Sequence, residues 1–205
     1  MIKAIIFDVG GVLIRTRDWT LRHKWEDRLG LAKGETDELV FGQPMGLRAQ
    51  LGEITSDQLW TWIGQRLKMS DSELSNFQRD FWAKDELDRE LIGLIRRLRP
   101  NYQTAIISNA MDDLRLMLNE KHLIASDFDL IVCSAEEGLM KPDPEIYRRT
   151  LERIGREPAE SIFVDDNEEN ISAARNLGIH VIRFTPELDL QYLFAELGVQ
   201  TEGAS

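Results

Sequence analysis

Carboxylate side chains follow two short apolar runs of the sequence. Asp8 comes directly after residues 3–7, and the pair Asp165-Asp166 comes directly after residues 161–164. Carboxylates share one site at low cost only when a cation neutralises them. Ligands that offer only oxygen, without histidine or thiolate, favour a hard ion such as magnesium. Each segment taken alone also fits a solvated turn or a helix cap, so the metal site is a hypothesis at this point.

Ser108 and Asn109 occupy a similar position in the middle of the chain. They end the apolar run 103–107, and a helix is expected to begin soon after them, near Met111. A hydroxyl group and the free backbone N–H groups of a helix N-terminus together form an anion site. The alternative is that Ser108 or Asn109 caps the helix without binding a ligand.

Lys141 stands immediately before the segment Pro142-Asp143-Pro144. Two prolines in three residues restrict the backbone ahead of a helix, and Pro144 suits the first turn of that helix. We therefore expect Lys141 to be held in one direction. A solvated surface lysine is the alternative, and only the neighbouring motifs argue against it.

The elements that would position these residues alternate between strand and helix. Apolar periodicity predicts helices around residues 87–98, 147–154 and 171–177, and strands at residues 3–7, 103–107, 129–133, 161–164 and 179–182. This alternation predicts an α/β fold with a doubly wound parallel sheet, covered by helices on both faces. Ligands bind such sheets beyond the carboxyl ends of the strands, where Asp8, Ser108 and Asp165 are expected.

One region lacks the alternation. Between residues 15 and 83 no strand is predicted, and helices are expected at residues 18–29, 55–67 and 71–82, with Ser56 and Ser70 as N-caps of the last two. The region also contains all five tryptophans: Trp19, Trp25, Trp60, Trp62 and Trp82. We expect these rings to form the core of a separately packed helical domain. The predicted division is a core domain of residues 1–14 and 84–205 and a helical domain of residues 15–83.

Composition excludes several classes of function. The 205 residues carry a formal net charge of −11, which weighs against a nucleic-acid partner because nucleic acids require a basic surface. No stretch reaches the roughly 20 apolar residues that a membrane-spanning helix needs. The single cysteine, Cys133, is expected to be a small buried residue and suits a cytoplasmic protein. Nothing in the sequence specifies an oligomeric state.

The motifs run along the chain in the order Asp, Ser, Lys, Asp-Asp, with a helical insertion after the first. This arrangement resembles the haloacid dehalogenase superfamily over essentially the whole chain. The resemblance implies a Rossmann-like core with a helical cap inserted after the first strand. It also implies hydrolysis of a small phosphorylated metabolite with Mg²⁺ as cofactor.

Site roles follow from the same resemblance, motif by motif. Asp8 would attack phosphorus and form an aspartyl-phosphate. Asp8, the Gly10 carbonyl and Asp166 would hold magnesium, with Asp165 and Asn170 supporting them. The phosphoryl oxygens would be bound by Ser108, the Asn109 backbone and Lys141.

The sequence departs from the superfamily pattern at Gly10. Superfamily phosphatases usually carry an aspartate there, which protonates the leaving oxygen and later deprotonates water. An Asp-x-Gly motif resembles the branch that contains glucose-1-phosphate phosphatases and the phosphatase-like domain of soluble epoxide hydrolases, as does the stretch 47–55 with Trp60. His23, in the helical region, is a candidate substitute for the missing acid.

Three other functions remain open on the sequence. A 2-haloacid dehalogenase also lacks the second aspartate, but it needs no metal and typically lacks the Asp165-Asp166 pair. A phosphoglucomutase-type activity depends more strongly on the missing aspartate. A catalytically weak scaffold that binds phosphometabolites or a protein partner is the alternative outside enzymes.

Overall fold

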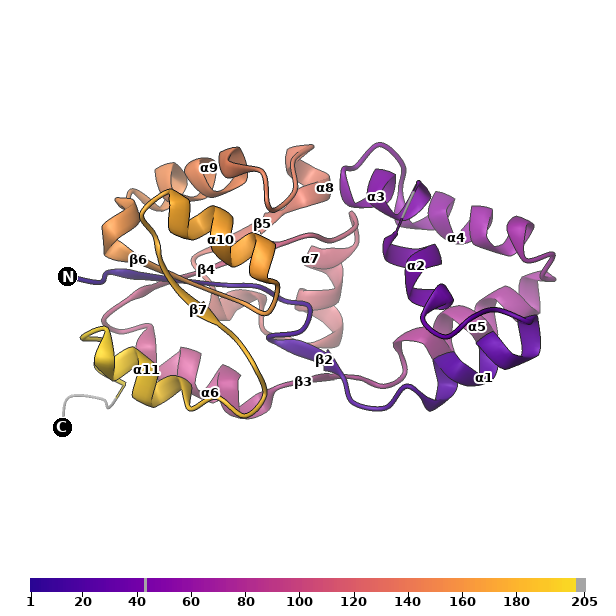
Figure 1. Cartoon of the computed structure of the whole chain (residues 1–205), viewed down its shortest axis with the longest axis horizontal. Coiled ribbons are helices and arrows are strands. Elements are labelled where there is room, and N and C mark those ends of the chain that lie inside the picture. The colour runs from indigo at the N-terminus through magenta and orange to yellow at the C-terminus, as the bar shows by residue number, and fades with distance from the viewer. Residues whose placement is uncertain (43, 202–205) are drawn as a thin grey trace.

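A five-stranded parallel sheet forms the centre of the protein, in a computed structural model that describes residues 1–42 and 44–201 (Figure 1). The strands lie in the order β5-β4-β1-β6-β7, and each pairs in parallel with its neighbours. Their bounds are β1 Ala4–Phe7, β4 Gln103–Ser108, β5 Leu130–Cys133, β6 Ser161–Asp165 and β7 His180–Arg183. The predicted α/β parallel fold is confirmed, and all five predicted strands are present.

Helices cover both faces of this sheet because successive strand residues point to opposite sides. Ile5 and Phe7 of β1 join one apolar cluster, and Ala4 and Ile6 join the other. The first cluster includes residues of α6 (Arg89–Leu98), α7 (Leu114–Leu116), the π-helical turn η1 (Met117–Lys121) and α11 (Leu190–Glu196). The second includes residues of α9 (Pro144–Ile154) and α10 (Glu168–Asn176). Shorter elements are η2 (Ala125–Asp127), α8 (Ser134–Glu137) and η3 (Pro158–Glu160).

The helical region after the first strand forms an apolar cluster of its own. Its helices are α1 (Thr20–Leu29), α2 (Glu35–Phe41), α3 (Met45–Gln50), α4 (Ser56–Arg66) and α5 (Asp71–Trp82). Trp25 and Trp60 are buried in this cluster, whereas Trp19 is 44% exposed, so the expectation that the tryptophans fill the interior holds only in part. Met111, from the loop after β4, also packs into the cluster.

Two short antiparallel strands connect the helical region to the sheet domain, and the first of them corrects the expectation that no strand occurs between residues 15 and 83. β2 (Ile14–Thr16) pairs with β3 (Asp85–Leu87). Strands of three residues are too short to produce a detectable apolar alternation. The helices α2 and α3 are likewise absent from the prediction, because each is only six or seven residues long.

The starts of two helices also differ from prediction. The N-cap of α4 is Thr55, not Ser56; the Thr55 hydroxyl accepts from Gln58 N, and the Gln58 side chain accepts from Thr55 N. Ser70 caps α5 as predicted, in the same reciprocal arrangement with Glu73. The helix expected near Met111 begins at Leu114, because a turn in which Leu114 N donates to Met111 O comes first.

Within the described residues, no helix combines the length and the apolar character that crossing a bilayer requires.

Candidate active site

Three carboxylates meet at the carboxyl edge of the sheet. Asp8 follows β1, and Asp165 and Asp166 end and follow β6; β1 and β6 are neighbouring strands, and Asp8 N donates to Val164 O at 2.9 Å. Each aspartate offers an oxygen, and these oxygens lie within 4.8 Å of one another. Asp8 is 8% exposed and Asp165 is fully buried, whereas Asp166 is open to solvent. We call these three residues the acidic cluster.

Lys141 is the cation of this site. Its Nζ lies 2.8 Å from Asp8 Oδ1 and 2.7 Å from Asp165 Oδ2, and the residue is only 2% exposed. A lysine is rarely buried unless it is paired, so this one is positioned rather than solvated. One ammonium group does not balance three ionised carboxylates, and the cluster therefore retains negative charge that a divalent cation would neutralise.

Asp165 is fully occupied by protein contacts. Its Oδ1 accepts from Asn167 N at 2.8 Å, and the Asn170 side chain donates to both carboxylate oxygens at 3.1–3.2 Å. With Lys141 on Oδ2, both oxygens are held. Asp165 is thus arranged to orient Lys141, and Asp166 is the carboxylate of the pair that stays accessible.

The pKa values of two of these aspartates show that their ionised forms are unfavourable at this buried edge. The pKa of Asp8 rises from 3.8 to about 7; burial is the main cause, the charge of Asp165 adds to it, and Lys141 opposes it. The pKa of Asp166 is also raised, by burial first and then by the charge of Asp165. A cation placed between these groups would favour their ionised forms. An oxygen-only donor set with surplus negative charge fits magnesium.

The turn after β1 comes close to Asp166 of the acidic cluster. Ile14 N donates to Val9 O and Gly11 N donates to Ile14 O, so neither hydrogen bond of this turn uses the Gly10 carbonyl. Gly11 has φ +75°, and a Cβ built on it would lie 2.0 Å from Asp166 Oδ2. Only glycine therefore allows the turn to approach Asp166 this closely.

Ser108 and Asn109 lie at the end of the neighbouring strand β4, and their surroundings differ from the predicted helix N-terminus. Ser108 ends β4 and is 3% exposed, and α7 begins only at Leu114. The Asn109 side chain binds the backbone of Lys141 on both sides: Nδ2 donates to Lys141 O and Oδ1 accepts from Lys141 N, each at 2.8 Å. Sequence reasoning gave Asn109 only a backbone role, because no sequence pattern signals a contact across 32 residues.

The helical region reaches the sheet domain close to this edge. Ser56 N donates to Asp112 Oδ1 at 2.9 Å, and the Ser56 hydroxyl donates to Asp113 Oδ2 at 3.2 Å. A Cβ on Gly52 would lie 2.0 Å from the carbonyl oxygen of Ala135, so the loop after α3 touches α8 directly (Figure 1). Sequence analysis did not identify these contacts. Among the described residues, no hydrogen bond or ion pair joins the His23 side chain to the acidic cluster, and its role stays a prediction.

Comparisons with known proteins identified a matching family, similar sequences and similar structures. A hydrolase family described as haloacid dehalogenase-like hydrolase matches residues 2–178. The sesquiterpene phosphatase astK of Aspergillus oryzae is 30% identical, with 91% of each chain covered. In structure, a haloacid dehalogenase family enzyme of Bacteroides thetaiotaomicron, solved with magnesium and inorganic phosphate, has a TM-score of 0.79 at 24% identity and covers 95% of this chain and 100% of its own.

Two other relatives are much longer than this chain. Acyl-CoA dehydrogenase family member 10 of Mus musculus is 30% identical over 96% of this chain, which spans 19% of that protein. Bifunctional epoxide hydrolase 2 of Sus scrofa is 26% identical over 88% of this chain, which spans 36% of that protein. The second match fits the branch that the Asp-x-Gly motif suggested.

Proposed function

The chain belongs to the haloacid dehalogenase-like hydrolases, and we propose that it is a magnesium-dependent phosphatase of small phosphate monoesters. The observation that carries this proposal is the acidic cluster with Lys141 at its buried side. It brings three carboxylates and a fixed ammonium group to one edge of the sheet, and in this proposal they serve as the nucleophile and as oxygen ligands for a divalent cation. Similarity to a curated phosphatase supports the same function.

Asp8 is the proposed nucleophile. Its Oδ1 accepts from Val9 N at 2.7 Å and lies 2.8 Å from Lys141 Nζ, so the carboxylate cannot rotate freely. An oxygen of Asp8 attacks phosphorus, the bond from phosphorus to the ester oxygen breaks, and the product is an aspartyl-phosphate. Water then attacks phosphorus, which releases inorganic phosphate and regenerates Asp8.

Three donors are proposed to bind the phosphoryl group. The proposal assigns its oxygens to the Ser108 hydroxyl, the Asn109 backbone N–H and the Lys141 ammonium, which offset the charge as the ester bond breaks. Because Lys141 also contacts Asp8 and Asp165, its ammonium is already oriented before a substrate arrives. Asp165 and Asn170 are positioning residues in this scheme, since they act through Lys141.

Magnesium is the proposed cofactor. Asp8, the Gly10 carbonyl and Asp166 would hold the ion, and the remaining ligands would be water and substrate oxygens, as magnesium prefers. When bound, magnesium would neutralise charge on the phosphoryl group and on the cluster. Magnesium and phosphate occur together in the similar structure from Bacteroides thetaiotaomicron, which supports this assignment by analogy of fold.

Substrate choice is proposed to depend on the helical region and on Gly10. We treat residues 15–83 as a cap and residues 1–14 and 84–205 as the core, joined through the β2–β3 ribbon. Without a side-chain acid at Gly10, esters whose leaving groups tolerate negative charge are favoured, and sugar-1-phosphates meet that condition. The proposed partner is therefore a small phosphorylated metabolite; a cytoplasmic location stays a prediction.

A comparison of two hydrolytic reactions tests the proposal. Purified protein is incubated with 4-nitrophenyl phosphate, with magnesium or with EDTA, and separately with 2-chloropropionate. We expect phosphate release that requires magnesium and no release of chloride. Chloride release without metal would identify a dehalogenase instead. If neither substrate is turned over, the result would indicate a binding scaffold.

A further inference from the structure

The loop between β4 and α7, residues 109–113, joins the candidate active site to the helical region. It follows Ser108 at the carboxyl edge of the sheet and ends where α7 begins, at Leu114. In Figure 1, α7 lies at the end of the sheet domain that faces the helical region. We call residues 109–113 the β4 loop. Each of its five residues has a partner outside the loop, so tertiary packing specifies its path.

Met111 anchors the β4 loop in the helical region. Its side chain is only 5% exposed and packs into the apolar cluster that includes Trp25 and Trp60. Among the described residues, every other member of this cluster lies between residues 25 and 82, so Met111 is the one side chain that the sheet domain contributes. Because buried side chains pack as densely as organic crystals, Met111 cannot move without displacing the helices around it.

The N-terminal end of α4 holds the next two residues of the loop. Ser56 N donates to Asp112 Oδ1 at 2.9 Å, and the Ser56 hydroxyl donates to Asp113 Oδ2 at 3.2 Å. Ser56 is the first residue of α4, so its N–H is one of the free donors of a helix N-terminus, where the helix dipole favours a carboxylate. One apolar and one polar anchor, both from the helical region, therefore hold residues 111–113.

The other end of the β4 loop holds Lys141. The Asn109 side chain bonds to both peptide groups of Lys141, each at 2.8 Å. Asn109 precedes Met111 by two residues, and two residues of chain span at most about 7 Å. A displacement of Met111 therefore reaches Asn109 through only two peptide units.

Two residues at the junction of β5 and α8 restrain the same loop from the sheet domain. The Ser134 hydroxyl accepts from Ala110 N at 3.0 Å and donates to Ala110 O at 3.1 Å. The Cys133 thiol, a weak donor, donates to Met111 O at 3.2 Å. These bonds act on backbone groups and leave the Met111 side chain to the helical region. The β4 loop is thus held from both parts of the chain.

We propose that Met111 is a positioning residue that acts through Asn109 on Lys141, which rests on the proposed function of Lys141 in binding the phosphoryl group. While the helical region buries Met111, the β4 loop keeps Asn109 where its side chain fixes the backbone of Lys141. When Met111 is displaced, Asn109 moves with it, and the ammonium group loses its fixed place beside Asp8. The placement of the cap thus sets the geometry of the catalytic lysine.

Amide hydrogen exchange measured by NMR tests this link without any turnover. The probe is the Lys141 N–H, which donates to Asn109 Oδ1, in protein free of metal and substrate. Met111→Ala should speed the exchange of this amide about 10-fold, because its hydrogen bond opens more often.

Ile63→Ala is the matched control. Ile63 is fully buried in the same apolar cluster, about two helical turns beyond Ser56 on α4, and its truncation removes a similar apolar volume. It should change the exchange of the Lys141 amide less than about 2-fold, because the anchor of the β4 loop stays in place.

Two further variants extend the test. Met111→Leu keeps the apolar volume and should leave the exchange of the Lys141 amide at the wild-type rate. Asp112→Ala changes an exposed residue, leaves the apolar cluster intact and removes the acceptor of Ser56 N. It should also speed exchange at Lys141, and it replaces Met111→Ala if that variant does not fold.

Steady-state kinetics test whether the link serves catalysis. With 4-nitrophenyl phosphate and magnesium, Met111→Ala should lower kcat about 10-fold, because small displacements of a catalytic group have effects of that order. In the Asn109→Ala background the same substitution should lower kcat less than about 2-fold, since residues that act through one contact are not additive.

The proposal is wrong if Met111→Ala and Asp112→Ala leave the exchange at Lys141 unchanged, which would show that Ser134 alone fixes the loop. It is also wrong if Ile63→Ala speeds this exchange as much as Met111→Ala, or if Met111→Ala lowers kcat equally in the wild-type and Asn109→Ala backgrounds. A wild type without turnover would contradict the proposed phosphatase function instead, and the exchange of the Lys141 amide would still decide whether Met111 positions it.

Discussion

The side chain of Asn109 clamps the peptide groups on both sides of Lys141. Nδ2 donates to the Lys141 carbonyl and Oδ1 accepts from the Lys141 N–H, each at 2.8 Å, although the two residues are 32 positions apart. This pair joins the loop after β4 to the loop before α9. It therefore fixes the backbone that carries the ammonium group, while Asp8 and Asp165 fix the ammonium itself.

Asn109→Ala should lower kcat by about 10- to 100-fold, because a shift of about 1 Å in a catalytic group has effects of that order. The matched control is Asn176→Ala, which truncates an exposed asparagine at the end of α10. Steady-state kinetics with 4-nitrophenyl phosphate measure both, and thermal unfolding checks that both are folded. Equal kcat values for the two variants would show that the clamp has no part in positioning Lys141.

The sheet domain was predictable because its signals are local. Each strand is a short apolar run, each covering helix has apolar residues at helical spacing, and the parallel order follows from their alternation. The connecting strands β2 and β3 were not predictable, since three residues show no periodicity and each strand is stabilised by the other. The N-cap of α4 was misplaced by one residue because Thr55 and Ser56 are chemically equivalent caps.

The catalytic candidates were predictable for a related reason: the ends of parallel strands must meet at one edge. Asp8, Ser108 and Asp165 are brought to that edge by β1, β4 and β6. No such rule predicts which loops will contact each other. The Asn109 clamp and the hydrogen bonds of Ser56 to Asp112 and Asp113 depend on tertiary packing that no sequence spacing encodes.

Asp8→Asn should abolish phosphatase turnover while the protein stays folded. The amide cannot act as a nucleophile toward phosphorus and is a poor ligand for a hard cation. The loss is measured as phosphate release in saturating magnesium, and the fold is checked by circular dichroism. A variant that keeps a substantial fraction of wild-type turnover would exclude Asp8 as the nucleophile.

The same variant should be more stable than the wild type at high pH. The folded pKa of Asp8, about 7 without metal, lies above the unfolded value of 3.8, so the wild type loses stability as pH rises through this range. The Asp8→Asn variant has no carboxylate at position 8 that could ionise, so it does not undergo this loss of stability. Asn109 and Lys141 are unchanged in the variant. In EDTA, its stability advantage in urea unfolding should grow by roughly 2 kcal/mol between pH 5 and pH 8. An advantage that is independent of pH would contradict the raised pKa.

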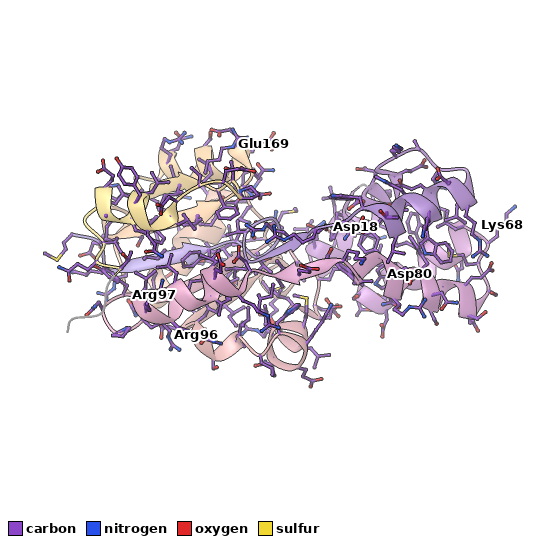
Figure 2. The ribbon with its side chains drawn as sticks, turned by 90° about the horizontal axis from the view of Figure 1, so that it is seen from below. Asp18, Lys68, Asp80, Arg96, Arg97 and Glu169 are labelled. Carbon is purple, nitrogen blue, oxygen red and sulfur yellow. The ribbon has the colours of Figure 1, made fainter. Side chains whose placement is uncertain are left out.

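Asp166→Ala should weaken magnesium affinity by at least about 100-fold, because it removes one of the few protein ligands of an ion that tolerates little distortion. The affinity is measured by titrating activity against magnesium. Glu169→Ala is the control: this exposed acid lies three residues further along, at the start of α10 (Figure 2). An unchanged magnesium dependence in Asp166→Ala would show that the metal site lies elsewhere.

Gly52→Ala should loosen the contact between the helical region and the sheet domain. Both Gly52 and Gly30 have positive φ, +71° and +68°, so alanine is strained at either position by about 1–2 kcal/mol. Only at Gly52 would the new Cβ meet a backbone atom, Ala135 O at 2.0 Å, whereas Gly30 has open space. Gly52→Ala should therefore increase hydrogen–deuterium exchange in α3 and α8 and raise KM, and Gly30→Ala should do neither. Matching exchange in the two variants would show that the close approach is unimportant.

Gly10 leads to a prediction about the leaving group. General acid catalysis typically supplies about 100- to 10,000-fold in rate, and this chain has no side chain at position 10 to provide it. The departing oxygen therefore carries more negative charge as the ester bond breaks. For a series of substituted phenyl phosphates, log rate plotted against leaving-group pKa should have a steep negative slope. Slow activation of water should also let the aspartyl-phosphate accumulate.

Gly10→Asp should flatten that slope. A Cβ at Gly10 meets nothing within 4 Å and Gly10 is not among the glycines with positive φ, so the first side-chain atom of the new residue requires no change in the turn. Gly10→Asn is the matched control, because it has the same shape and cannot donate an acidic proton, and its slope should stay as steep as that of the wild type. A flat slope in the wild type would show that another acid is already in place. His23→Ala would then be the variant to measure, with a steep slope expected if His23 is that acid.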